Sequence, residues 1–220
     1  MDTDGLIYAD AAAQGHAGVR HNAGYYATAP SLFRGAMELW QGTLHGTGYA
    51  LEDYTLVDIG CGKGRVLMLA AEYAFREIVG VELDPKLVRV ARQNLSRLQR
   101  RRWFGLRAPR IPPSATRRVR IIEGDALNVA VPDGPVALFY FNSFELEMAR
   151  IWLEHLGAIA RHRAAPLDLI YIHPEFDALV RQVPGMRVMA ETGISFSKED
   201  ADADVFGVGE DRCCMYRWGG

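Results

Sequence analysis

The chain has 220 residues, of which 49% are hydrophobic and 24% are charged, and its formal net charge is −2. This balance is that of a globular domain with a sizeable core, and it gives no overall attraction to nucleic acid or to an anionic membrane. No apolar run reaches the ~20 residues that a membrane span needs, and residues 1–5 are acidic and lack the apolar core of a signal sequence. The sequence therefore predicts a soluble, cytoplasmic protein with no membrane partner.

The three cysteines, Cys61, Cys213 and Cys214, provide neither a disulfide framework nor the spacing of a metal site. Cys213 and Cys214 are neighbours in a predicted strand, so they are expected to point to opposite faces of a sheet. We expect them to be small core residues in a reducing compartment. No metal ion is expected.

Apolar periodicity and turn residues predict alternating strands and helices along most of the chain. Residues 1–46 are predicted to form an N-terminal cap segment, with a helix from Ser31, its N-cap, to about Leu44. Residues 47–220 form the main domain. Strands are predicted at 54–59, 77–82, 118–123, 136–141, 167–172, 186–190 and 211–218. Helices are predicted at 64–75, 85–100, 145–161 and 175–182.

This alternation predicts an α/β fold, a doubly wound and mostly parallel seven-stranded sheet with helices on both faces. The last two strands have no long helix between them, which predicts an antiparallel hairpin at one edge. The acidic residues 198–204 between these strands are expected to form a solvated loop. Ligands of such open sheets bind beyond the carboxyl ends of the strands, so the residues that follow each strand are the candidate site residues.

The most informative motif follows the first predicted strand, where Gly60, Gly62 and Gly64 are spaced two apart. A strand, a glycine turn and a helix open a nucleotide-binding α/β unit, although a glycine turn can also simply join a strand to a helix. A dinucleotide fingerprint places its third glycine three residues after the second, and Arg65 occupies that position here. This spacing disfavours a nicotinamide-dependent oxidoreductase. The carboxylate of Asp58, two residues before the first glycine, suits a ligand with an ammonium group.

Further acidic residues end the next two predicted strands. Glu82 follows Asp58 by about two dozen residues, near the distance at which such folds place a carboxylate on ribose hydroxyls. Asp84 precedes Pro85 and is interpreted as the N-cap of the following helix. Asp125 follows the third strand, where on its own it would be a turn residue.

Together these three motifs resemble those of the class I S-adenosylmethionine-dependent methyltransferases, over roughly residues 50–175. The resemblance implies a methyltransferase domain over residues 47–220 that transfers a methyl group from S-adenosyl-L-methionine to an acceptor. It implies that the cofactor is bound by residues at the strand ends, which are Asp58, Ile59, Gly60, Cys61, Gly62, Gly64, Glu82, Leu83, Asp125, Ala126 and Asn142. A non-catalytic nucleoside-binding regulatory module would keep the same acidic residues and stays open as an alternative.

The fourth predicted strand ends in Asn142, Ser143 and Phe144, where amino-methyltransferases carry an Asn or Asp, prolines and an aromatic residue. Asn-Ser-Phe is similar to the Asn-Asn-Phe of non-SET histone-lysine methyltransferases and to the Asn-Pro-Phe of uncharacterised bacterial methyltransferases. Some of the latter have an upstream Tyr-x-Pro-Thr-x-Tyr segment, which the stretch from Tyr26 to Pro30 matches in part. The resemblance implies an amine acceptor, a protein lysine or a small molecule, near Tyr26, Asn142 and Phe144. The prolines are missing, so Asn142 reads equally as a helix cap or turn residue, and Phe144 as a core aromatic.

Few residues qualify as a general base that takes a proton from an amine. His173, at the end of the fifth predicted strand, lies on the functional edge of the sheet, although a helix-capping role is equally consistent. Residues 97–118 are strongly basic and include two aromatic side chains, a composition that suits RNA. A solvated helix end with an exposed loop explains the same composition. We therefore expect no nucleic acid partner, and RNA methylation remains an alternative function.

Overall fold

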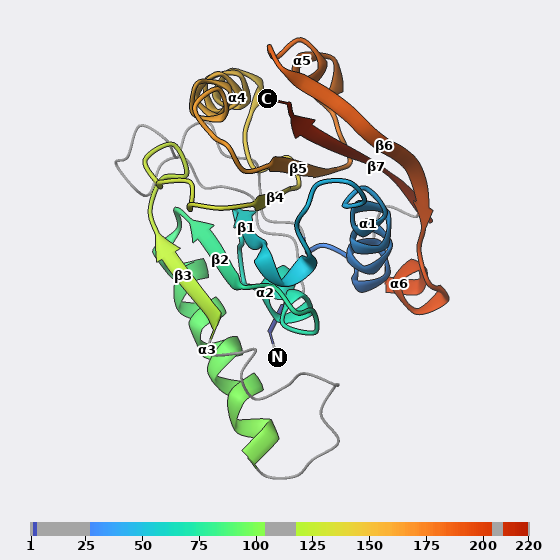
Figure 1. Cartoon of the computed structure of the whole chain (residues 1–220). Coiled ribbons are helices and arrows are strands. Elements are labelled where there is room, and N and C mark those ends of the chain that lie inside the picture. The colour runs from blue at the N-terminus through green and yellow to red at the C-terminus, as the bar shows by residue number, and fades with distance from the viewer. Residues whose placement is uncertain (1, 4–26, 104–117, 204–208, 220) are drawn as a thin grey trace.

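The computed structural model describes residues 2–3, 27–103, 118–203 and 209–219, and its centre is one seven-stranded sheet (Figure 1). The strand order is β3-β2-β1-β4-β5-β7-β6. The parallel strands are β1 (Thr55–Ile59), β2 (Glu77–Glu82), β3 (Val119–Glu123), β4 (Val136–Tyr140) and β5 (Leu167–Ile172). β7 (Glu210–Trp218) is antiparallel to β5, and the edge strand β6 (Met186–Ser195) is antiparallel to β7. The predicted doubly wound sheet with an antiparallel edge hairpin is confirmed.

Helices cover both faces of the sheet because its central strands are apolar on both sides. α1 (Pro30–Gly42), α2 (Arg65–Ala70) and α3 (Pro85–Trp103) pack on one face, and α4 (Leu146–Ala160) and α5 (Asp177–Arg181) on the other (Figure 1). Leu56 of β1 belongs to the first core and the adjacent Val57 to the second. Cys213 and Cys214 also divide between the two cores, so the prediction that they are buried and face opposite ways is confirmed.

A buried ion pair fixes α1 to the sheet. The guanidinium of Arg217 on β7 donates to both oxygens of Asp168 on β5, over 2.6 and 2.7 Å. The indole Nε1 of Trp40 on α1 donates to the same carboxylate over 2.9 Å. Because all three side chains are buried, these charge-assisted bonds hold the helix in one place.

Three elements of the structure differ from the sequence prediction in their boundaries or their type. β6 extends five residues beyond the predicted end at residue 190, because it pairs with β7 along its full length. Residues Lys198–Ala203 form a short helix, α6, where a solvated loop was expected. α1 begins at Pro30 after the N-cap Ala29, so the prediction of Ser31 as N-cap is wrong. The backbone N–H of Ser31 instead donates to Asp200 Oδ2 of α6 over 2.7 Å. A partner remote in sequence thus replaces the local cap.

Candidate functional site

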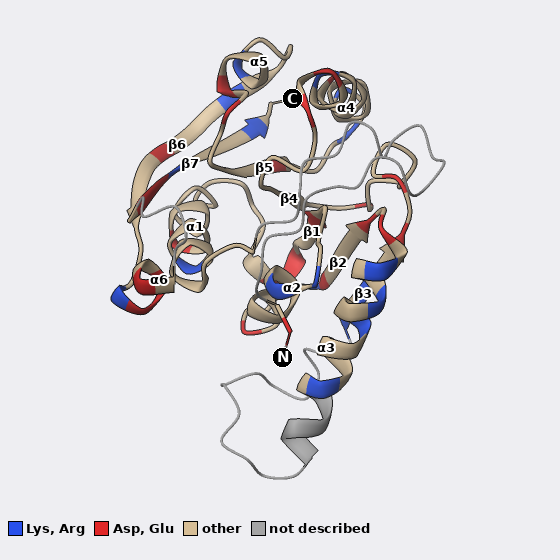
Figure 2. Cartoon of the chain, turned by 180° about the vertical axis from the view of Figure 1, so that it is seen from behind, with Lys and Arg blue, Asp and Glu red and all other residues tan. Residues whose placement is uncertain are grey.

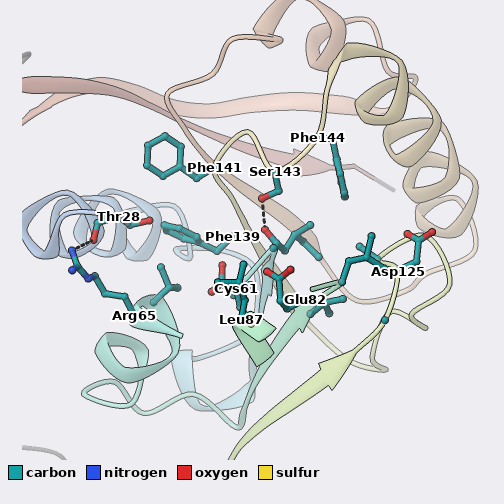
Figure 3. Close-up of a pocket in the computed structure, with 18 of the residues that line it drawn as sticks. Thr28, Cys61, Arg65, Glu82, Leu87, Asp125, Phe139, Phe141, Ser143 and Phe144 are labelled. Carbon is teal, nitrogen blue, oxygen red and sulfur yellow. Dashed lines mark hydrogen bonds between the residues drawn. The ribbon is translucent and has the colours of Figure 1, made fainter. Parts of the chain in front are cut away.

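A pocket opens at the carboxyl ends of the parallel strands, facing the segment that precedes α1 (Figure 3). It comprises about 860 Å³ of space between atoms, part of it open to solvent. This is the edge at which open α/β sheets bind their ligands. Nine residues predicted from the sequence line it, and these are Asp58, Ile59, Gly60, Cys61, Glu82, Leu83, Asp125, Ala126 and Phe144.

The three motif glycines have left-handed backbones, with φ values of 74°, 52° and 81° for Gly60, Gly62 and Gly64. A Cβ on Gly60 would lie 2.4 Å from the Ser143 hydroxyl oxygen, so no larger residue fits at this close approach of two strand ends. The N–H of Gly62 donates to Glu82 over 2.8 Å, and Gly64 is the N-cap of α2. Gly62 and Gly64 do not line the pocket, and they shape the turn that forms its floor.

Two buried carboxylates lie at the centre of the pocket. Asp58 is buried on β1, and its Oδ2 has no hydrogen-bond partner among the residues that the structure describes. Burial, and then the charge of Glu82, raises the pKa of Asp58 well above its usual range. The two oxygens of Glu82 each accept a backbone N–H, from Asp84 and Gly62 over 2.8 Å. Burial raises the pKa of Glu82 while these two bonds lower it. Neighbouring carboxyl groups with shifted pKa values in a cleft are typical of binding sites.

The remaining polar groups lie at the two ends of the pocket (Figure 3). Asp125 Oδ1 accepts the N–H of Leu127 over 2.9 Å, so this residue does form the turn that its sequence position suggested, and it also lines the pocket. At the opposite end, Arg65 Nη1 donates to the carbonyl of Thr28 over 3.4 Å. Sequence reasoning used Arg65 only to exclude a dinucleotide fingerprint. The sequence signal that could have placed Arg65 in the pocket was its position directly after the third glycine, at the start of α2.

The segment after β4 alternates between the pocket and the next strand. Phe141 and Ser143 line the pocket, whereas Asn142 between them does not. The Asn142 amide donates to the His173 carbonyl and accepts the Tyr171 hydroxyl, each over 2.6 Å. Asn142 is not a helix cap, since the N-cap of α4 is Glu145. Its predicted contact with donor or acceptor stays a prediction, and Tyr26 lies outside the described residues.

Phe144 has both of the roles considered from the sequence. It is buried, its ring centroid lies 5.7 Å from that of Tyr140 and 5.5 Å from that of Trp152, and it lines the pocket. The core aromatic that the sequence suggested therefore forms one wall of the site. Asp84 behaves as predicted, because its Oδ1 accepts the N–H of Lys86 over 2.7 Å at the start of α3.

The family model described as a methyltransferase domain matches residues 56–164, which run from β1 to beyond α4. The matched residues include the glycine turn and all three pocket carboxylates. The chain is a class I S-adenosylmethionine-dependent methyltransferase.

Solved methyltransferase structures share the fold at low sequence identity. Magnesium protoporphyrin IX methyltransferase from Synechocystis PCC 6803 is 15% identical, with a TM-score of 0.53 over 86% of this chain and 80% of that chain. Precorrin-6y C5,15-methyltransferase from Geobacter metallireducens GS-15 is 14% identical, with a TM-score of 0.51 over 86% and 87%. The N-methyltransferase NodS from Bradyrhizobium japonicum WM9 is 10% identical, with a TM-score of 0.51 over 88% and 90%. At these identities the similarity concerns the fold alone.

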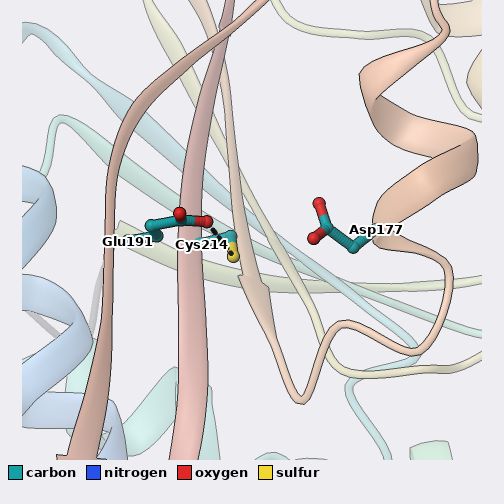
Figure 4. Close-up of side chains that lie close together, drawn as sticks. All are labelled: Asp177, Glu191 and Cys214. Atoms are coloured by element: carbon teal, nitrogen blue, oxygen red, sulfur yellow. Dashed lines mark hydrogen bonds between the residues drawn. The ribbon is translucent and has the colours of Figure 1, made fainter.

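Outside the pocket of this methyltransferase, Asp177, Glu191 and Cys214 have ligand atoms within 4.8 Å of one another (Figure 4). Arg212 Nη2 lies 2.7 Å from Asp177 Oδ2 and 2.9 Å from Glu191 Oε2, and Arg181 pairs with the same two carboxylates. Burial alone would raise the pKa of Asp177, but hydrogen bonds, the strongest from Arg181, lower it to about 2. The guanidinium groups use the oxygens that a cation would need, so we interpret this cluster as an ion-pair network.

Positive charge gathers along α3 of the methyltransferase (Figure 2). Residues 85–122 hold 12 of the 25 lysines and arginines and no acidic residue. Lys86, Arg89 and Arg97 are exposed, and residues 104–117 of the basic segment lie outside the described residues. None of the helices in the described ranges is long and apolar enough to cross a bilayer. The expectation that this solvated face has no nucleic acid partner stays a prediction.

Proposed function

We propose that the pocket binds S-adenosylmethionine along its length and that the enzyme methylates an amine. Across the pocket, Arg65, Glu82 and Asp125 follow one another in this order (Figure 3). The donor offers an amino acid group, a ribose and an adenine in the same order. Arg65 would hold the carboxylate of the amino acid, Glu82 would accept the ribose hydroxyls, and Asp125 would accept the adenine amine.

This proposal is carried by the buried oxygen of Asp58, which has no hydrogen-bond partner among the described residues. A buried carboxylate without a partner is costly, and burial has raised its pKa. The ammonium group of the donor would supply the partner, and it would favour the ionised carboxylate. A ligand without a cationic group would leave this cost in place. The glycine turn leaves room for such a ligand to approach the backbone closely.

The donor supplies a methyl group that its sulfonium already activates, so the protein mainly has to align the acceptor. Phe141 and Phe144 line the pocket at the end of β4, with Phe139 of the same strand. Aromatic faces attract cationic groups, and an amine acceptor becomes cationic as it is methylated. These rings therefore support an amine, on a small molecule or a protein lysine, as the acceptor.

Titration calorimetry with S-adenosylhomocysteine, the demethylated product, tests the donor site, with a nicotinamide dinucleotide as the non-binding control. Methyl-tritiated S-adenosylmethionine and an extract of the cells of origin then test transfer. We expect tritium in an amine that co-purifies as one species. Binding without transfer would favour the non-catalytic module, tritium in RNA would replace the amine, and absence of binding would refute the proposed function.

A further inference from the structure

Two residues beyond the pocket have backbones that non-glycine residues rarely adopt. Among the residues that the structure describes, Asn142 and His173 alone combine a side chain with a positive φ, at 44° and 49°. Tyr140 of β4 pairs with Tyr171 of β5 in the parallel register, so each strained residue stands two places after a paired tyrosine. Such conformations persist where surrounding contacts impose them, and they cluster at functional sites.

Hydrogen bonds hold these two residues together. Asn142 Nδ2 donates to the His173 carbonyl over 2.6 Å. The Tyr171 hydroxyl accepts the N–H of Phe176 over 3.2 Å and donates to Asn142 Oδ1 over 2.6 Å. The N–H of His173 donates to the Arg212 carbonyl of β7 over 2.9 Å. The backbone of His173 is thus held by residues that follow β4 and lie on β7.

The imidazole of His173 makes a hydrogen bond at Nδ1 and a longer contact with Glu175 at Nε2. Its Nδ1 lies 2.9 Å from Oδ1 of Asp211, whose side chain is 13% exposed, while the His173 side chain is 48% exposed. A carboxylate oxygen at this distance accepts a hydrogen bond from Nδ1–H, which leaves the lone pair on Nε2 of the neutral ring to accept a proton. The ring centroid lies 6.3 Å from that of Phe141, which lines the pocket. The oriented imidazole therefore lies next to a residue that lines the pocket.

We propose that His173 is the general base of methyl transfer, that Asp211 orients its imidazole and that Asn142 positions its backbone. This inference rests on the proposed function. The lone pair of a neutral amine forms the new N–C bond, and the electron pair of the C–S bond leaves with sulfur. The methylated nitrogen, now cationic, gives its proton to His173 Nε2. The acceptor class is accordingly an amine that carries at least one hydrogen on the attacking nitrogen.

The charged groups that face the ring suit this role. Asp211 on β7 lies against Nδ1, and Glu175, which follows β5, has Oε1 3.7 Å from Nε2. Both are acidic, so their charge is opposite to that of the imidazolium that forms when the ring accepts the proton. The guanidinium of Arg212, the neighbour of Asp211, pairs with carboxylates of α5 and β6. Proton transfer by a positioned side chain contributes about 10²- to 10⁴-fold to a rate.

The test compares His173→Gln with His155→Gln, a control at an exposed histidine of α4. Tritium transfer into the cell extract and affinity for S-adenosylhomocysteine are measured on both variants and on the wild type. We expect His173→Gln to lose at least a hundredfold in transfer at neutral pH with affinity within twofold, and the control to keep both. A His173→Gln variant that binds and transfers like the wild type would overturn the proposal. A wild type without affinity would refute the proposed function instead.

A second measurement determines the tautomer of the His173 ring in the absence of substrate. Nitrogen NMR of the free protein, assigned by comparison with His173→Gln, should show His173 in the Nδ1–H form at a pH where it is neutral. In Asp211→Asn we expect this preference to be lost and the pH dependence of transfer to shift. A wild-type ring with its proton on Nε2 would contradict the proposal, because that nitrogen could then accept nothing.

Discussion

Replacing Asp58 with asparagine should stabilise the free protein and weaken donor binding at the same time. The pKa of this buried carboxyl is raised above the ordinary value of 3.8. The folded chain therefore holds the proton more tightly than the unfolded chain does. As the pH rises from about 3.8 through the raised pKa, the folded state loses stability relative to the unfolded state. An asparagine side chain has the same shape and no charge, so this loss disappears in the variant.

The structure sets the size of both effects. A hydrogen bond to a charged group contributes about 1.5–3 kcal/mol, so loss of the contact with the donor ammonium should weaken S-adenosylhomocysteine binding roughly ten- to a hundredfold. Relief of the buried charge should be worth about 1 kcal/mol, because the new amide also lacks a partner. In a chain of this size that corresponds to a rise in Tm of about 2–4 °C.

Calorimetry with S-adenosylhomocysteine and thermal melts from acidic to mildly alkaline pH measure these effects. The Tm difference between Asp58→Asn and the wild type should grow with pH. Asp168→Asn is the matched control, since Asp168 is also buried but paired with Arg217. Breaking that pair should cost about 3–5 kcal/mol of stability and leave affinity at low temperature unchanged. If Asp58→Asn instead lowers the Tm and binds the ligand normally, Asp58 is a structural residue.

Three further perturbations have defined outcomes. Glu82→Gln keeps an oxygen for one backbone N–H but loses the charge that ribose hydroxyls would contact. Calorimetry should therefore show at least a tenfold loss of S-adenosylhomocysteine affinity. Unchanged affinity would mean that Glu82 does not belong to the binding site. Gly60→Ala places a Cβ 2.4 Å from Ser143 Oγ at a φ of 74°, so its melting temperature should fall by several degrees, and a normal melt would contradict the close approach. A fluorescent RNA should show no sub-micromolar affinity at physiological salt, and a tight, salt-sensitive complex that is lost on neutralising the α3 arginines would prove this expectation wrong. The arginines to neutralise are the last three of the six in α3, which are Arg100, Arg101 and Arg102.

The fold was largely predictable because its signals are local. The central strands are short apolar runs, with a glycine after β1 and a glutamate at the end of β2, and both cores follow from the burial of both faces. The errors lie where partners are remote in sequence. At the start of α1 the N–H of Ser31 is bonded to Asp200, 169 residues away in the sequence, and the full length of β6 follows from its pairing with β7. Neither partner is visible in the propensities of the segment itself.

The site was predictable where function requires a residue type at a fixed spacing, as at Asp58 and Glu82. Side-chain direction was not predictable at the end of β4. There the chain leaves the strand in a left-handed conformation at Asn142, so the alternation of a strand no longer decides which residues face the pocket. The contacts of Asn142 with β5 could be known only once the register of two strands 31 residues apart was available.

Asp58 and Asp168 show how the sheet separates stability from binding. Both are buried aspartates within strands of the same sheet, on β1 and β5. Asp168 has Arg217 and Trp40 as partners, so its charge is compensated and it fixes α1 in place. Asp58 retains an oxygen without a partner in the described residues, so its charge costs stability until a cation arrives. Stability alone disfavours a buried carboxylate of this kind, whereas a site for a cationic ligand requires one.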